Sequence, residues 1–163
     1  MNYAYQGRNP PSHLVAMNAS YGLASNNPNL WFTDSGASSH MTNDLANLDI
    51  SNEYTGSDDT AIANGQGLNI SHIGSSSLHT NSHSFGLKNV LCVPSHSSNL
   101  LSVHKICVDN NYKCVFDSQM LEIQDLKTGK TLYRGPCHNG LYPIQVSSSH
   151  SNPNILCNSS PSA

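Results

Sequence analysis

Charged residues are scarce in this sequence: they make up 10% of 163 residues, and the formal net charge is −3 with neutral histidines. No run of lysine and arginine is present, so the basic footprint of a nucleic-acid-binding protein is missing. No apolar run approaches the roughly 18 residues that a membrane-spanning helix needs. Residues 1–11 contain no apolar segment of a secretory signal. We therefore expect a cytoplasmic protein that contacts neither membrane nor nucleic acid.

Cysteine pairs at metal-binding or redox spacing are also absent. Five cysteines lie at positions 92, 107, 114, 137 and 157, and none of them forms a C-x-x-C motif. We interpret them as reduced thiols, mostly buried as small apolar groups. His72, His79 and His83 lie close together, but in a segment that we expect to be strand or loop their spacing does not form a helical zinc site. We predict no metal ion and no other cofactor.

The two ends of the chain lack apolar periodicity. Residues 1–30 are rich in Asn, Pro, Ser and Gly, and residues 147–163 contain seven serines and two prolines. Such composition favours linkers over packed structure. We predict a disordered linker over residues 1–30, one folded domain over 31–146 and a disordered tail over 147–163.

The central segment shows short apolar runs separated by turn residues, which is typical of a β protein. Asn64-Gly65 is the strongest hairpin signal, because both central residues of a type I′ turn need positive φ. We predict strands over residues 30–33, 60–63, 68–73, 87–93, 112–116, 120–124, 131–134 and 141–146.

One segment departs from this pattern. Residues 99–108 carry apolar residues at helical spacing. Ser98 or Asn99 can cap the start of this helix, and Asn110 or Asn111 can end it. Several short strands with one short α-helix predict an all-β fold, a small barrel or sandwich.

The sharpest chemical signal is Asp34-Ser35-Gly36, which directly follows the apolar run 30–33. Gly36 has no Cβ, so a substrate backbone can approach the turn closely. Two such turns facing each other would bring together two carboxylates that share one proton and activate a water, as in aspartic proteases. The same three residues are also common in structural turns, so the motif alone leaves that alternative open.

Three longer stretches surround this motif: residues 31–42 (WFTDSGASSHMT), residues 63–74 with their glycines, and residues 87–103. Shorter matches follow at residues 125, 128–129, 135 and 140–144. Together they resemble the protease region of copia-type LTR retrotransposon polyproteins, over about residues 31–144.

The resemblance implies a retropepsin-like fold, a small closed β-barrel with one short α-helix. It implies a homodimeric aspartic endopeptidase that cleaves the element's own polyprotein, in the cytoplasm or in a virus-like particle. The motif occurs once, so each chain would supply one carboxylate. The implied catalytic residues are Asp34, Ser35 and Gly36. The implied substrate-binding residues are Ala37 and Ser38, with Asn64, Gly65, Gln66 and Gly67 in a hairpin flap that closes over the peptide.

Two departures keep an alternative open. Retropepsins carry a glycine shortly before their helix, whereas residues 92–98 contain none. The chain also continues for about 35 residues beyond the predicted helix, where retropepsins soon end. The alternative is a non-catalytic β-barrel module of a truncated polyprotein. A nucleic-acid binder of the capsid region is disfavoured by the missing basic run. His40 is expected to be a surface turn residue, with a hydrogen-bonding role near the site as the other possibility.

Overall fold

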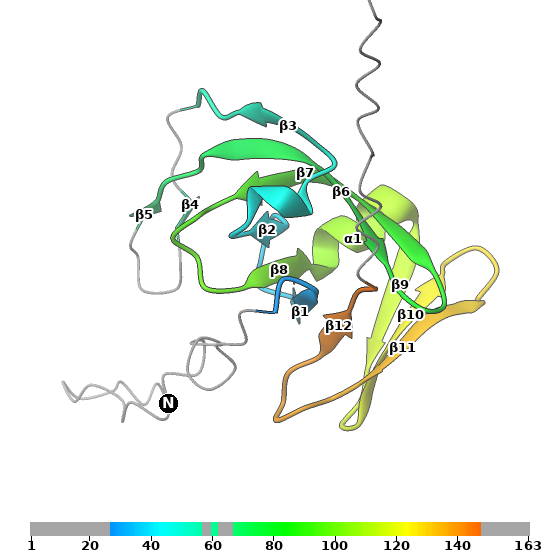
Figure 1. The fold of residues 1–163 in the computed structure, drawn as a ribbon. Helices are drawn as coiled ribbons and strands as arrows, with labels where there is room; N and C mark the ends of the chain where they lie inside the picture. Colours follow the sequence, from blue (N-terminus) through cyan, green and yellow to red (C-terminus); the bar gives the residue numbers. More distant parts are fainter. Residues whose placement is uncertain (1–26, 57–59, 62–66, 148–163) are drawn as a thin grey trace, which may run out of the picture.

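The computed structural model describes residues 27–56, 60–61 and 67–147 (Figure 1). Within these residues the chain is mostly β with one α-helix, which confirms the predicted composition of elements. The bounds are β1 Leu30–Asp34, β2 Met41–Thr42, a 3-10 turn Leu45–Asn47, β3 Ile50–Glu53, β4 Thr60–Ala61, β5 Gly67–Leu68, β6 His72–His79, β7 Ser84–Cys92, β8 Asn99–Ser102, α1 Val103–Asn110, β9 Tyr112–Phe116, β10 Met120–Asp125, β11 Thr131–Pro136 and β12 Pro143–Gln145.

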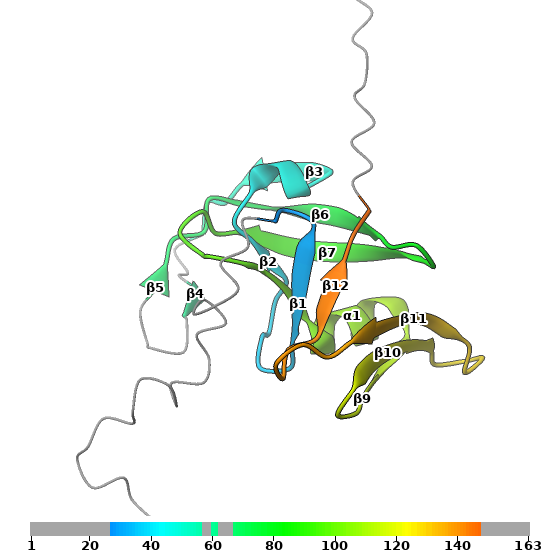
Figure 2. The ribbon, with the colours of Figure 1, turned by 60° about the horizontal axis from the view of Figure 1, so that its bottom comes forward.

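The largest sheet has seven strands in the order β12-β1-β8-β2-β7-β6-β3 (Figures 1 and 2). The β1–β8 and β2–β7 pairs are parallel, and the other neighbouring pairs are antiparallel. Among the described strands no pairing joins β3 to β12, so this sheet is open and does not form the closed barrel that we predicted. The parallel pairs bring strands that are distant in sequence together at the centre of the sheet.

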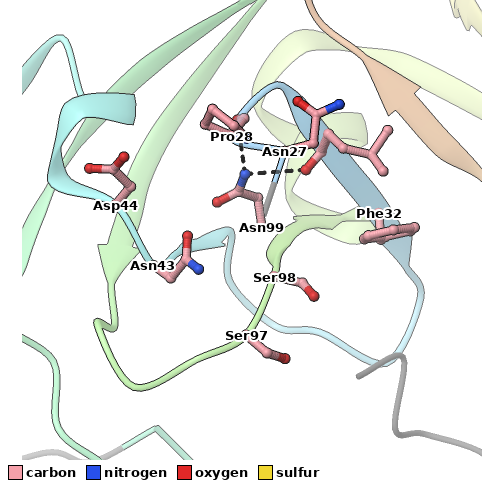
Figure 3. Close-up of a pocket in the computed structure, with 9 residues that line it drawn as sticks. Asn27, Pro28, Phe32, Asn43, Asp44, Ser97, Ser98 and Asn99 are labelled. Carbon is pink, nitrogen blue, oxygen red and sulfur yellow. Dashed lines mark hydrogen bonds between the residues drawn. The ribbon is translucent and has the colours of Figure 1, made fainter. Parts of the chain in front are cut away.

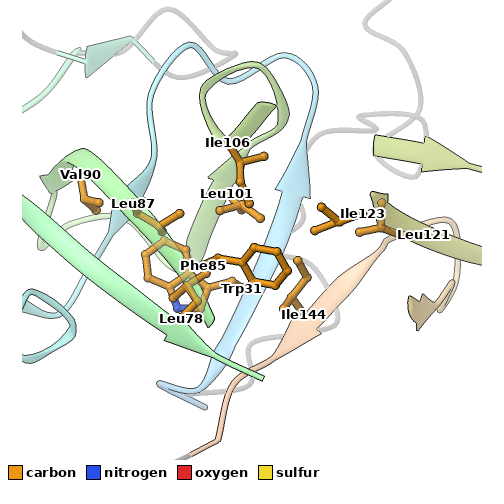
Figure 4. Close-up of a cluster of buried hydrophobic side chains, with 10 residues drawn as sticks. All are labelled: Trp31, Leu78, Phe85, Leu87, Val90, Leu101, Ile106, Leu121, Ile123 and Ile144. Carbon is orange, nitrogen blue, oxygen red and sulfur yellow. The ribbon is translucent and has the colours of Figure 1, made fainter. Parts of the chain in front are cut away.

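A second sheet, in the order β11-β10-β9, packs beside α1 (Figure 2). The helix contacts β7 and β8 on one side and β9 on the other. Residues from both sheets and the helix form one hydrophobic cluster, so the strands after α1 complete the main core (Figure 4). The buried members of this core are Trp31, Leu78, Phe85, Leu87, Val90, Leu101, Ile106, Leu121, Ile123 and Ile144.

The predicted helix over 99–108 is partly wrong. Its first four residues form β8, which runs parallel to β1, and the helix begins only after Ser102. The Ser102 side chain accepts from the amide of Lys105 and caps the helix start. Asn111 ends the helix in the left-handed region at φ 56°, as its position predicted. Leu100 and Leu101 of β8 pack into two different hydrophobic clusters, so both faces of this strand carry apolar residues. Together with the apolar residues of α1 they resemble a helical repeat in the sequence.

The hairpins follow the sequence prediction closely after the helix and less closely before it. The β9–β10 hairpin and β11 lie where we predicted them. Thr60 pairs with Leu68, which confirms a hairpin there, although its turn at 62–66 lies outside the described residues. The predicted strand 68–73 is wrong, because it divides into β5 and β6. We did not predict β2 or β3 as strands, nor β6 at its full length.

Candidate functional site

The predicted catalytic turn begins at the last residue of β1. Asp34 lies in register with Ser102, the last residue of the parallel strand β8. Adjacent residues of a strand point to opposite faces, so Phe32 and Asp34 share the face opposite Trp31 of the main core. The carboxylate therefore lies at a strand end, on the face of β1 that is turned away from that core.

The turn is open to solvent on its outer side. Asp34 and Ala37 are half-buried, whereas Ser35, Gly36 and Ser38 are exposed. The amide of Gly36 donates to Asp34 Oδ1 at 2.7 Å, which ties the orientation of the carboxylate to the backbone of the turn. A Cβ on Gly36 would lie 3.3 Å from that same oxygen. The structure thus places all five predicted turn residues together and leaves the carboxylate reachable.

The inner side of the turn is fastened to the fold by Ser102. Its hydroxyl donates to the carbonyl of Ala37 at 2.6 Å, and its amide donates to Nδ1 of His40 at 3.1 Å. Both Ser102 and His40 are fully buried. The prediction of His40 as a surface turn residue is therefore wrong, because the chain enters the sheet at β2 directly after it.

The electrostatic state of His40 follows from its burial. Burial lowers the pKa of His40 from 6.5 to about 4; the smaller effects of Asp109 and Lys105 raise and lower it respectively. The ring is therefore neutral at neutral pH, and its Nδ1 is free to accept from Ser102. Its Nε2 has no hydrogen-bond partner among the described residues.

The predicted flap lies only partly within the described residues. Gly67 is exposed at the start of β5, whereas Asn64, Gly65 and Gln66 lie outside the described residues. The neighbouring Leu68 packs against a second, smaller cluster, which also receives Leu100 from β8. This second cluster has a buried centre of Met41, Ile70 and Val93. Leu100 is in register with Phe32, so the base of the hairpin packs on the face of the sheet that carries Phe32 and Asp34.

A hollow of about 350 Å³ lies on this side of the sheet, at the start of β1 (Figure 3). Phe32 lines it, together with Asn43, Asp44, Ser98 and Asn99, but Asp34 does not. A second hollow of about 580 Å³, between the β6–β7 turn and β11, contains none of the predicted site residues.

Asn99 at the first hollow is a structural residue, although its position in the sequence suggested only a helix cap. Its Nδ2 donates to the carbonyls of Pro28 and Leu30, drawn as dashed lines in Figure 3. Its Oδ1 accepts from Thr42 Oγ1 at 2.7 Å and from Asn47 Nδ2 at 3.3 Å. One buried amide thus holds the start of β1 against β2 and the turn that follows it.

Other chemistry is sparse in the part of the chain that the structure describes. There, no group of three or more His, Cys, Asp or Glu side chains is arranged to hold a metal ion. Two of the three histidines that we considered as ligands bond to other groups, His79 to Ser84 and His83 to Tyr112. No helix in the described residues is long and apolar enough to cross a membrane.

The described residues form a mostly β domain with a half-buried carboxylate at the end of β1, and sequence comparison gives its family. Residues 31–112 match the family described as "Pol polyprotein, beta-barrel domain", and the chain belongs to that family. The chain is similar to the retrovirus-related Pol polyprotein from transposon RE1 of Arabidopsis thaliana, with 38% identity over 86% of the chain. It is also similar to that from transposon RE2 of the same plant, with 40% identity over 85%.

The chain spans about a tenth of the length of these curated relatives, 10% of the first and 9% of the second. No solved structure matches it. The chain is therefore a β-barrel domain of a retrotransposon Pol polyprotein by family, and its chemistry has to be argued from the site itself.

Proposed function

We propose that this domain is the aspartic endopeptidase of a copia-type polyprotein and acts as a homodimer with a retropepsin-like arrangement. The observation that carries the proposal is the reachable Asp34 carboxylate, which lies in a turn whose backbone accepts a hydrogen bond from the buried Ser102 hydroxyl. Catalytic carboxylates must be held in fixed positions on rigid elements, and the end of a central strand provides this.

The proposed chemistry needs two copies of the chain. Two carboxylates in contact cannot both ionise, so the pair holds a single proton. The ionised Asp34 accepts a proton from the attacking water, and the protonated Asp34 of the partner donates to the peptide carbonyl oxygen. In this dimer Ser35 would brace the two turns across the axis, while the backbone at Gly36 and Ala37 would hold the substrate.

The position of the hairpin supports a peptide substrate. Leu68 of β5 packs against the second cluster, on the face that carries Phe32 and Asp34, and β4 pairs with β5. A hairpin over that face would exclude water and hold a peptide extended, with Ser38 and residues 64–67 as its contacts. The substrate that we propose is the element's own polyprotein, processed in the cytoplasm or in a virus-like particle.

Two observations favour the alternative, a non-catalytic module. Neither of the two hollows described above includes Asp34, and the described strands of the main sheet do not close into a barrel. A domain of this kind would keep the fold and serve as a spacer or an assembly element. The two functions make opposite predictions for the removal of one carboxylate.

The test is peptide cleavage by the full chain, with peptides that cover the Pol polyprotein as substrates. Activity should be blocked by a pepstatin-type inhibitor, should vanish in Asp34→Asn and should rise faster than linearly with enzyme concentration while dimers are scarce. Asp117→Asn is the matched control, because Asp117 is also a turn aspartate that accepts backbone amides and it lies outside the proposed site. Cleavage that survives in Asp34→Asn would end the proposal, and a folded dimer that cleaves nothing would favour the spacer.

A further inference from the structure

We propose that Ser102, held in place by His40, is the positioning residue of the aspartate turn, because it fixes the carbonyl of Ala37 and so the direction of the Asp34 carboxylate. Its catalytic consequence rests on the proposed peptidase function. The effect on the geometry of the turn does not, and it is measured separately.

The hydroxyl and the amide of Ser102 both form hydrogen bonds with a structural purpose. Its hydroxyl donates to Ala37 O at 2.6 Å and accepts from the amide of Lys105 at 3.2 Å. Its amide donates to His40 Nδ1 at 3.1 Å. The same residue therefore ends β8, caps α1 and holds the turn, so the helix and the turn are joined at one buried atom, Ser102 Oγ.

His40 holds Ser102 from the opposite side. Its ring is buried and neutral, and its carbonyl accepts from the amide of Leu91 at 2.9 Å, which joins it to β7. The charged groups that act on the ring are Asp109 and Lys105, which are paired with each other on α1 at 3.4 Å. The unprotonated Nδ1 is the acceptor that the Ser102 amide needs, and an imidazolium could not supply it.

The link from Ser102 to the carboxylate runs through the short backbone of the turn. Asp34 Oδ1 accepts from the amide of Gly36, and Gly36 is bonded directly to Ala37. If the Ala37 carbonyl lost its hydrogen bond to Ser102, the Gly36 amide could therefore move, and the Asp34 carboxylate that accepts from it could move as well. In a dimer the two carboxylates must meet at hydrogen-bond distance, and a displacement of about 1 Å can lower the rate about 100-fold.

The experiment compares four full-length variants with the wild type. Ser102→Ala removes the hydroxyl, Ser102→Thr restores it, and His40→Asn keeps an acceptor near Nδ1. Ile123→Val is the stability control: it trims the buried core on β10 and leaves the turn contacts unchanged. We expect kcat in Ser102→Ala to fall at least tenfold with KM little changed. Ser102→Thr and His40→Asn should each keep most of the wild-type kcat. If Ser102→Ala matched Ile123→Val in kcat, the proposal would be overturned.

A second readout does not need activity. Backbone NMR order parameters of residues 35–38 should fall from about 0.85, typical of rigid backbone, to below about 0.6 in Ser102→Ala alone. If the wild type cleaves no peptide but the turn loosens in this variant, the peptidase proposal fails and the positioning role stands. If the turn keeps its order parameters in Ser102→Ala, the positioning role fails whatever the activity.

Discussion

Acid should destabilise this domain through one buried histidine. His40 is fully buried, and its pKa is lowered from 6.5 to about 4, with burial as the largest cause. In the unfolded chain the same imidazole titrates near 6.5. Between these two values the unfolded state binds more protons than the folded state, so the free energy of unfolding falls as the pH falls.

The size of the effect follows from the two pKa values. Above pH 6.5 both states hold a neutral ring, and the contribution to stability is fully present; it is lost as the pH falls to 4. The difference corresponds to about 3 kcal/mol over the whole window, of which about 2 kcal/mol falls between pH 7 and pH 5. In the folded state a proton on Nδ1 would also face the Ser102 amide, which is itself a donor.

The assay uses the single tryptophan of the chain as its reporter. Trp31 is 1% exposed in the core, so its fluorescence should change on unfolding in urea. Free energies of unfolding are measured at pH 7, 6 and 5 for the wild type and for His40→Asn, which keeps an acceptor but does not titrate. The difference between the two proteins removes the effect of the other titrating groups. We expect the wild type to lose about 2 kcal/mol more than the variant between pH 7 and pH 5. Parallel losses, or an NMR titration of His40 near pH 6.5, would refute the reasoning.

Three further outcomes are expected. Asn99→Asp should cost about 3 kcal/mol in urea unfolding, because a carboxylate would face the carbonyls to which the amide donates; exposed Asn52→Asp should change little. Gly74→Ala should free β3 and speed its amide exchange, because the new Cβ would collide with the Ile50 carbonyl, whereas Gly86→Ala has room. Burial, with the Cys107 thiol nearby, raises the pKa of Cys114 to about 12, so its alkylation at pH 8.5 should be at least tenfold slower than that of glutathione.

Local signals explain what the sequence could predict of the fold. The β9–β10 hairpin and β11 depend on turns whose residues are adjacent in the chain, such as Asp117, which accepts the amides of Gln119 and Met120. The helix end depends on Asn111, a residue type that tolerates the left-handed region. Each of these features is determined by a few neighbouring residues, so composition and spacing are enough to find it.

Long-range pairing explains what the sequence could not predict. β8 is a strand because β1, about 70 residues earlier in the chain, lies parallel to it, and no local pattern of residues 99–102 records this partner. A bulge in the β6–β7 ladder, with Asn89 at φ 52°, shifts the register between Gly74 and Ser76. The site shows the same limit: the Asp34 turn stood out in the sequence, whereas Ser102 and His40 gain their roles only from the fold.

The strands after the helix belong to the support of the aspartate turn, although the family match ends at residue 112. β12 pairs with β1 from its outer side, and the carbonyl of Tyr142 accepts both the amide and the hydroxyl of Thr33, the residue before Asp34. Leu121 and Ile123 of β10 complete the core that buries Trp31, which lies on β1 together with Thr33 and Asp34. The strand that carries the carboxylate is thus held by β8 on one edge and β12 on the other. The strands beyond the family match are therefore part of what fixes the Asp34 turn.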